Sequence, residues 1–192
     1  RAFRIAATDY VETLLLGPLM SALQGEAPGV SVRTVRPPQV FAPPEEALRE
    51  GEVDLALGHF PAATRPRPDL LYMALFHDRF VAVVRARHPR VGKRLTLERF
   101  LTLPQIRIVY PRDVSLGLVD AVLASRGRER RVSLTVSGMS PIAAIVAESD
   151  LLGIVPERLA REWARVRPLR LLDLPVAIPD LPLTLVWHAS RQ

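Results

Sequence analysis

The stretch RIAATDYVETLLLGPLM, residues 4–20, decides the fold. Its apolar start predicts a buried strand over residues 3–7, and the polar pair Thr8-Asp9 then precedes a long run with apolar residues at helical spacing. Thr and Asp are favoured just before a helix because their side-chain oxygens accept hydrogen bonds from amides of the first turn. We therefore predict a strand that turns at Thr8 or Asp9 into a helix, which Gly25 and Pro28 end.

The alternation of strand and helix continues toward residue 57. Residues 30–35 alternate as a strand does, and the run Pro43-Pro44-Glu45-Glu46 then opens a short helix that Gly51 closes. Residues 53–57 predict the next strand. Strand, helix, strand, helix, strand with short links indicates a parallel sheet covered by helices.

A second series follows two extended runs, residues 70–76 and 79–84, which the polar pair His77-Asp78 separates. The further strands and helices that we predict are a helix that Thr96 caps and that ends at residue 101, strand 106–110, helix 115–125, strand 132–136, a helix from Ser140-Pro141 to residue 149, strand 152–155, a helix from Pro156-Glu157 through Trp163, and a last strand over 183–187. The proline-rich residues 174–182 predict a second crossing between two lobes. We place residues 1–75 with 181–192 in one lobe and 76–180 in the other, with the two crossings as hinges.

Composition excludes several classes of protein. The 192 residues include no cysteine, which excludes disulfides and thiolate metal sites and fits a cytoplasmic protein. No apolar run is long enough to cross a membrane. The chain has 26 basic and 20 acidic residues, net +6. All basic residues except Lys93 are arginines. They are scattered, apart from Arg126, Arg128, Arg130 and Arg131, and have no interleaved aromatic residues or helix-turn-helix pattern, so we interpret them as a solvated surface rather than a DNA footprint.

The common catalytic motifs are absent from the sequence. It has no G-x-S-x-G, no P-loop, no glycine-rich dinucleotide fingerprint and no H-E-x-x-H. The four histidines lie in different segments without the spacing of metal ligands. We expect no enzyme activity, no cofactor and no metal site.

Candidate ligand contacts lie at the strand-to-helix junctions, because open α/β sheets bind ligands beyond the carboxyl ends of their strands. Each has a structural alternative: a cap for Thr8 or Asp9, a core position for Tyr10 or Phe60, a turn for Gly58 and a surface position for Arg36 or His59. The junctions combine hydroxyls and backbone amides, which suits a small anionic or aromatic ligand. The candidates from the residues themselves are Thr8, Asp9, Tyr10, Arg36, Pro37, Gly58, His59, Phe60, Ser115 and Met139.

Four segments in this order resemble a known family. They are FRIAATDYVETLLLGPLMSALQGEAPGVSVRTVRP, LREGEVDLALGHF, LFHDRFVAVVRARHP and LGLVDAVLASRGRERRVSLTVSGMSPIAAIVAESDLLGIVPERLA. Together, through their order and spacing, they resemble the effector-binding region of a LysR-type transcriptional regulator. The resemblance runs from near residue 1 to at least residue 160, and is closest to the branch of nodulation regulators and sensors of aromatic acids.

The resemblance implies an α/β fold of the periplasmic-binding-protein-like type 2, with two lobes that each hold a mixed sheet and a small effector bound in the cleft between them. It places Thr8, our first choice for a ligand contact, and the junctions at Arg36 and Gly58 on the first lobe's side. The second lobe would add residues 114–116 and Met139. Many aromatic-sensing relatives have a histidine where this chain has Leu116, which leaves the identity of an aromatic or acidic effector open.

The family also implies partners. Its members carry a winged helix-turn-helix and a linker helix ahead of this region, so we expect the chain to be a piece of a regulator that contacts DNA only through those missing segments. We expect a homodimer or homotetramer, no membrane contact and a cytoplasmic location. Two alternatives stay open: a solute-binding protein of a transport system and a small α/β enzyme.

Overall fold

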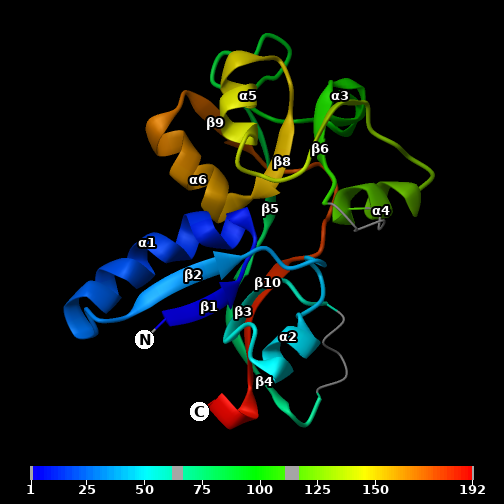
Figure 1. Cartoon of the computed structure of the whole chain (residues 1–192). Helices are drawn as coiled ribbons and strands as arrows, with labels where there is room; N and C mark the ends of the chain where they lie inside the picture. The colour runs from blue at the N-terminus through cyan, green and yellow to red at the C-terminus, as the bar shows by residue number, and fades with distance from the viewer. Residues whose placement is uncertain (1, 62–66, 111–116, 192) are drawn as a thin grey trace. The chain divides into compact units, whose positions relative to one another are not determined.

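The chain forms two compact units in a computed structural model that describes residues 2–61, 67–110 and 117–191 (Figure 1). Unit 1 consists of Arg1–His77 and Pro182–Gln192, and unit 2 of Asp78–Leu181. The chain therefore leaves unit 1 after His77 and returns to it at Pro182. In the part of the chain that is described, no helix has the length and hydropathy that a membrane span requires.

Unit 1 is built on a five-stranded sheet in the order β2-β1-β3-β10-β4. The predicted parallel sheet is present, because β1 pairs in parallel with both β2 and β3, and Ala6 lies opposite both Val35 and Ala56. β10 pairs antiparallel with β3. The elements of unit 1 are β1 (Ala2–Ala6), α1 (Asp9–Glu26), β2 (Ser31–Val35), α2 (Glu45–Glu50), β3 (Leu55–Gly58), β4 (Leu70–Asp78), β10 (Leu181–His188) and the short 3-10 helix η1 (Ala189–Arg191).

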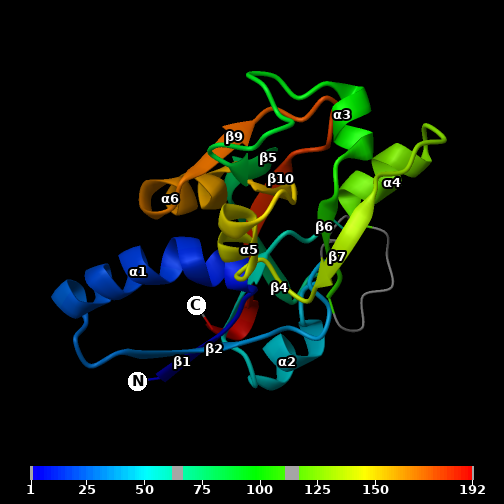
Figure 2. The same ribbon diagram turned by 90° about the horizontal axis from the view of Figure 1, so that it is seen from above.

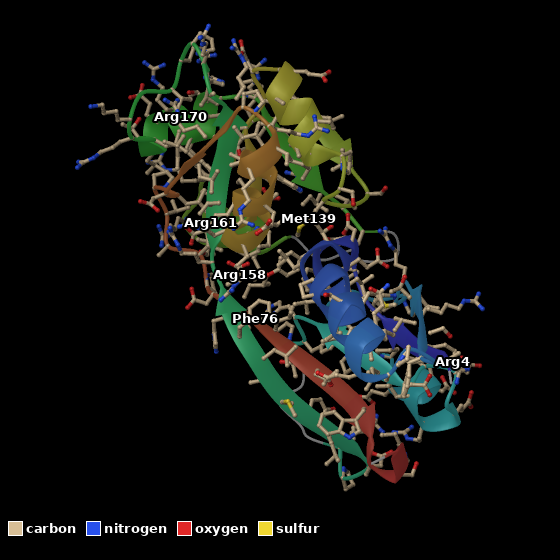
Figure 3. The ribbon with its side chains drawn as sticks, turned by 90° about the vertical axis from the view of Figure 1, so that its left-hand side faces the viewer. Arg4, Phe76, Met139, Arg158, Arg161 and Arg170 are labelled. Carbon is tan, nitrogen blue, oxygen red and sulfur yellow. The ribbon has the colours of Figure 1, made fainter. Side chains whose placement is uncertain are left out.

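Hydrogen bonds of Asp54 fasten the start of β3 to β1. The Asp54 carboxylate accepts from the Arg4 amide at 2.8 Å, and the Asp54 amide donates to the Arg4 carbonyl at 2.8 Å. The Arg4 guanidinium adds contacts to the Asp54 carboxylate, at 3.3 Å, and to the Gly51 carbonyl (Figure 3). Gly51 ends α2 at φ 73°, a left-handed conformation that glycine adopts without strain. These contacts fix the register of β3 against β1.

Helix α1 buries only its first turn. Asp9, Tyr10 and Val11 are buried, whereas the leucines farther along stay partly exposed. Pro18 lies inside the helix on its exposed side. The start of α1, at the carboxyl end of β1, is therefore the part of the helix that the core of unit 1 holds in place.

Unit 2 contains two small sheets. β5 lies between β8 and β9 and pairs antiparallel with both, whereas β6 and β7 form a separate parallel pair (Figure 2). The fully buried Phe100 packs in a core to which the three-stranded sheet of β5, β8 and β9 and helices α3 and α4 contribute. The elements of unit 2 are β5 (Phe80–Arg85), α3 (Leu97–Thr102), β6 (Gln105–Ile108), α4 (Leu118–Ala124), β7 (Val132–Val136), α5 (Ile142–Glu148), β8 (Gly153–Pro156), α6 (Glu157–Val166) and β9 (Leu169–Leu172).

A buried polar network ties α4 to β6. Nε and Nη2 of Arg130 donate to the two carboxylate oxygens of Asp120 at 2.8 and 2.9 Å. Nη1 donates to Gln105 Oε1 at 3.2 Å and to the Ile106 carbonyl at 3.0 Å. The side chains of Arg130 and Asp120 are only 5% and 10% exposed. Because the network is hydrogen-bonded throughout, it can stay inside the core.

Several boundaries differ from the prediction. β4 continues through the His77-Asp78 pair, and the carboxylate of Asp78 accepts from the amides of Arg79 and Arg158. Asp78 thus caps α6, whose own N-cap residue is a proline without a capping side chain. Helix α4 begins at Leu118 rather than at residue 115, and α6 continues to Val166.

Two details of unit 2 extend the prediction. β9 was not predicted, because its four residues follow a proline and its pairing with β5 is not visible in the local sequence. Helix α5 begins directly after Pro141, the second residue of the predicted Ser140-Pro141 start, and proline itself has no side chain that could cap the helix.

Candidate functional site

Three of the predicted junctions meet at one edge of unit 1. β1 lies between β2 and β3 and runs parallel to both, so the carboxyl ends of all three strands lie at the same edge of the sheet. The Ala7 amide extends this pairing by donating to the Val35 carbonyl at 3.0 Å. The segments that begin at Thr8, Arg36 and Gly58 therefore lie next to one another, with Thr8 in the middle.

Thr8 holds the N-cap position of α1 without using its side chain there. Its backbone is extended, at φ −91° and ψ 163°, and its carbonyl accepts from the Glu12 amide at 3.0 Å. The hydroxyl makes no capping hydrogen bond, and the residue is half-buried. The expectation that Thr8 is only a cap therefore does not describe its hydroxyl, which is available to a ligand.

Asp9 and Tyr10 are more deeply buried than Thr8. Asp9 is 7% exposed in the first turn of α1, where a carboxylate interacts favourably with the positive end of the helix dipole. Tyr10 is 4% exposed. Asp9 and Tyr10 thus lie in the buried first turn of α1, whereas the preceding residue, Thr8, is half-buried.

Gly58 and Phe60 form a close contact at the end of β3. A Cβ atom on Gly58 would lie 2.8 Å from two atoms of the Phe60 ring, so only glycine lets the ring lie against this backbone. Phe60 is buried and belongs to the core of unit 1 together with Leu48 and Val186. Its role here is packing, which was one of the two alternatives that the sequence left open.

His59 links the same junction to the strand that returns from unit 2. Its Nδ1–H donates to the Pro182 carbonyl at 3.1 Å, and its ring lies edge-on to Phe41 with centroids 6.1 Å apart. Burial lowers the pKa of His59, although the bond to Pro182 partly opposes that effect. The ring is therefore neutral at pH 7, with Nε2 as a hydrogen-bond acceptor.

The second junction offers one exposed and one buried residue. Arg36, directly after β2, is exposed, whereas the next residue, Pro37, is buried. Proline fixes the direction of the chain at this point because its ring restricts φ. Arg36 is thus an exposed cationic residue at this edge.

The remaining predicted site residues belong to unit 2. Met139 is 9% exposed in the segment between β7 and α5, and its carbonyl accepts from the Ile142 amide at 3.0 Å. Ser115 and Leu116 lie outside the described residues. Within the ranges that the structure describes, no group of three or more histidine, aspartate or glutamate side chains could hold a metal ion.

Sequence reasoning missed Phe41 and Pro182. Both contact His59, but Pro182 is 123 residues away from it in the chain, and no local pattern indicates such a pairing. The proline-rich run before the last strand was the only signal, and it indicated a crossing rather than a contact. At this edge, a hydroxyl, a neutral imidazole, a guanidinium and the first-turn amides of α1 provide polar groups that can orient a small ligand.

Known proteins that resemble this one match it over nearly its whole length. Residues 1–192 match the family described as the LysR substrate binding domain. The chain is 32% identical to the HTH-type transcriptional activator NagR of Ralstonia sp over 99% of its own length, and 29% identical to Nodulation protein D 2 of Rhizobium tropici over 98%. It covers 61% and 58% of these two proteins, so it spans about three fifths of the curated relatives.

A solved structure shows the same fold. The probable transcriptional regulator PA0477 from Pseudomonas aeruginosa superposes with a TM-score of 0.90 at 34% identity, covering 100% of this chain and 63% of that one. The predicted likeness to nodulation regulators and related transcriptional activators is confirmed, and so is the two-lobed α/β fold of the periplasmic-binding-protein type. The chain belongs to the LysR-type transcriptional regulators and is the effector-binding domain of that family.

Proposed function

We propose that the chain senses a small molecule that binds at the carboxyl edge of β1, β2 and β3. The observation that carries the proposal is the hydroxyl of Thr8, which stands at the centre of this edge and takes no part in capping α1. The match of all 192 residues to an effector-binding domain supports a ligand at the carboxyl ends of the strands.

The polar groups suggest how the ligand is held. The Thr8 hydroxyl and the amides of Asp9 and Tyr10 offer donors, His59 offers a neutral acceptor, and Arg36 offers a positive charge. An aromatic or acidic molecule fits this set, since a carboxylate or phenol would accept from the donors. We propose that Gly58, Pro37 and Phe60 shape the wall. The predicted contacts Ser115, Leu116 and Met139 belong to unit 2, and we propose that they also bind the effector.

In the whole regulator, ligand binding would be coupled to DNA. We propose that a DNA-binding segment precedes this domain, since NagR is described as an HTH-type activator and is longer than this chain. The effector would bias the arrangement of paired subunits in a cytoplasmic homodimer or homotetramer. The bias cannot exceed the difference in effector affinity between the two arrangements.

The two alternatives have less support. A solute-binding protein shares the fold, but the chain matches the regulatory family over its full length and its relatives are transcriptional activators. A small α/β enzyme would have to turn a ligand over, and the sequence offers no catalytic motif for that. We therefore propose binding without catalysis.

A pair of threonine variants tests the proposal. A panel of small aromatic and aliphatic acids and phenols is first screened by thermal melting, where a ligand at about 100 times its dissociation constant adds about 2.7 kcal/mol. Calorimetry then compares Thr8→Val with Thr13→Val, whose hydroxyl donates to the Asp9 carbonyl within the same helix. We expect weaker binding only for Thr8→Val. Equal affinity of Thr8→Val and the wild type would remove Thr8 from the site.

A further inference from the structure

The two units differ sharply in charge. By sequence, unit 1 contains 8 Lys and Arg against 9 Asp and Glu, whereas unit 2 contains 18 against 11. Unit 2 therefore carries the entire positive net charge of the chain. Such an asymmetry within one chain is typical of a surface that meets a polyanion.

The basic side chains gather at one end of unit 2. Hydrogen bonds join the loop after β5 to the start of β9: Ala86 N donates to the Pro168 carbonyl at 2.7 Å, and Arg170 Nη2 to the Val91 carbonyl at 2.6 Å. Figure 3 shows Arg170 at this end of the unit and Arg158 at the other. We call the following exposed residues the basic end: Arg87, Arg90, Lys93, Arg94, Arg99 and Arg167.

Arg99 belongs to the same surface although it lies on α3. Its Nη1 donates to the Arg90 carbonyl at 2.8 Å, which holds α3 against the loop. The acceptor is an uncharged backbone carbonyl, so this hydrogen bond does not neutralise the charge of the guanidinium. The loop after β5, Arg99 of α3 and residues 167–170 are thus joined by one backbone hydrogen bond and two bonds from arginine side chains to backbone carbonyls.

The charges of the basic end are not neutralised by the protein. Within the residues that the structure describes, none of its six side chains forms an ion pair with a carboxylate. Other arginines of unit 2 do form such pairs: Arg79 contacts Glu157 at 2.6 Å and Asp173 at 2.8 Å, and Arg85 contacts Asp150 at 2.7 Å. The sequence suggested scattered, solvated arginines, but folding brings unpaired ones together.

The chemistry of the surface points to phosphate on a double helix. Arginine binds phosphate oxygens through two parallel hydrogen bonds. No Phe, Tyr or Trp lies in residues 85–99 or 165–170, so the surface lacks the aromatic platforms on which unpaired bases stack. We propose that the basic end of unit 2 contacts the phosphates of duplex DNA without reading its sequence. This proposal goes beyond effector sensing. The full regulator would then contact DNA twice, through the DNA-binding segment proposed above and through this sequence-independent surface.

Two triple variants with the same change in charge test the proposal. Arg87→Glu, Arg90→Glu and Lys93→Glu together reverse the basic end. Arg126→Glu, Arg128→Glu and Arg131→Glu together make the same change on the exposed link between α4 and β7. Fluorescence anisotropy measures the binding of a labelled duplex of about 30 base pairs and arbitrary sequence by the 192-residue chain, from 50 to 200 mM NaCl.

We expect the basic-end triple to lose phosphate contacts and the control triple to keep them. Each lost contact reduces the salt slope by about 0.9, so over this fourfold change in salt the wild type should lose about 40-fold more affinity than the basic-end variant. If that triple does not fold in a thermal melt, Lys93→Glu alone should still show a difference of about 3.5-fold. Equal effects of both triples would mean that net charge alone matters and would overturn the proposal.

Three further outcomes would also overturn it. They are no duplex binding by the wild type at 50 mM NaCl, no effect of the basic-end triple, and tighter binding of single-stranded RNA than of duplex. Effector binding by the basic-end triple is measured separately and should match the wild type. Failure of the DNA proposal is thereby kept apart from failure of the sensing proposal, whose proposed contacts include no residue of the basic end.

Discussion

Replacing Asp120 by Asn should strongly destabilise unit 2, because it breaks a buried ion pair from one side. The amide oxygen of Asn can still accept from Arg130 Nε. Its NH2 group, however, would face Arg130 Nη2, which donates to the carboxylate at 2.9 Å in the wild type, so two donors would meet. A guanidinium whose side chain is 5% exposed would then lack its counter-charge. Removing one partner of a buried pair costs about 3 to 5 kcal/mol. For a chain of this size that lowers Tm by about 6 to 20 °C.

An exposed pair of the same chemistry is the control. Arg165 contacts Glu162 at 2.7 Å, but these side chains are 72% and 44% exposed. Arg165→Ala should cost no more than about 0.5 kcal/mol, since water replaces the lost contact. Urea unfolding at pH 7 measures both variants. A cost for Asp120→Asn below about 1 kcal/mol would show that the network does not support the core.

Acid titration gives a second measurement of the same network. Burial by itself would raise the pKa of Asp120, but the hydrogen bond and charge of Arg130, with the charge of Arg107, hold it below its ordinary value. The carboxylate therefore contributes stability above its unfolded pKa near 4, and this is lost as the pH falls through the lower folded value. The difference in free energy of unfolding between the wild type and Asp120→Asn should therefore become smaller in that pH range. A difference that does not depend on pH would refute the electrostatic explanation.

Three other predictions concern single contacts. Gly153→Ala should cost about 1 to 3 kcal/mol, because its Cβ would lie 2.8 Å from Ile142 Cγ2, whereas Gly92→Ala, which meets no atom within 4 Å, should be nearly neutral; equal urea midpoints would contradict this. Asp78→Ala should cost about 1 kcal/mol by removing the cap of α6, with hydrogen exchange fastest in the first turn; unchanged exchange there would exclude the cap. Because burial lowers the pKa of His59, the unfolded chain takes up its proton first below about pH 6.5, so melts from pH 7 to 5 should destabilise the wild type more than His59→Gln; parallel curves would argue against this.

Local signals predicted the elements well. Thr96 was expected to cap α3, and its hydroxyl accepts from the Arg99 amide at 3.3 Å. Gly51 was expected to close α2 and does so with a positive φ. In both cases the stabilising contact lies within a few residues, so the sequence pattern contains all of it.

Contacts between distant segments could not be predicted in this way. Asp78 was interpreted as a break between strands, although its carboxylate caps a helix 80 residues later. β9 becomes a strand because it pairs with β5, not because of its own residues. At the candidate site, parallel pairing accounts for the meeting of three junctions, but the bond from His59 to Pro182 joins residues that no local pattern relates.

The position of β10 beside β4 has a consequence for how the chain folds. Ala189, just after β10, donates to the Asp69 carbonyl, just before β4, so the two strands run in opposite directions and His77 and Pro182 lie at the same end of the sheet. During synthesis unit 2, which is continuous in sequence, can fold before β10 emerges. If unit 2 were unfolded, bringing β10 to β4 would close a flexible loop of about 100 residues, at an entropic cost of about 4 kcal/mol. A folded unit 2 between the two strands avoids that cost. Variants that slow the folding of unit 2 should therefore delay the last step of unit 1, the insertion of β10.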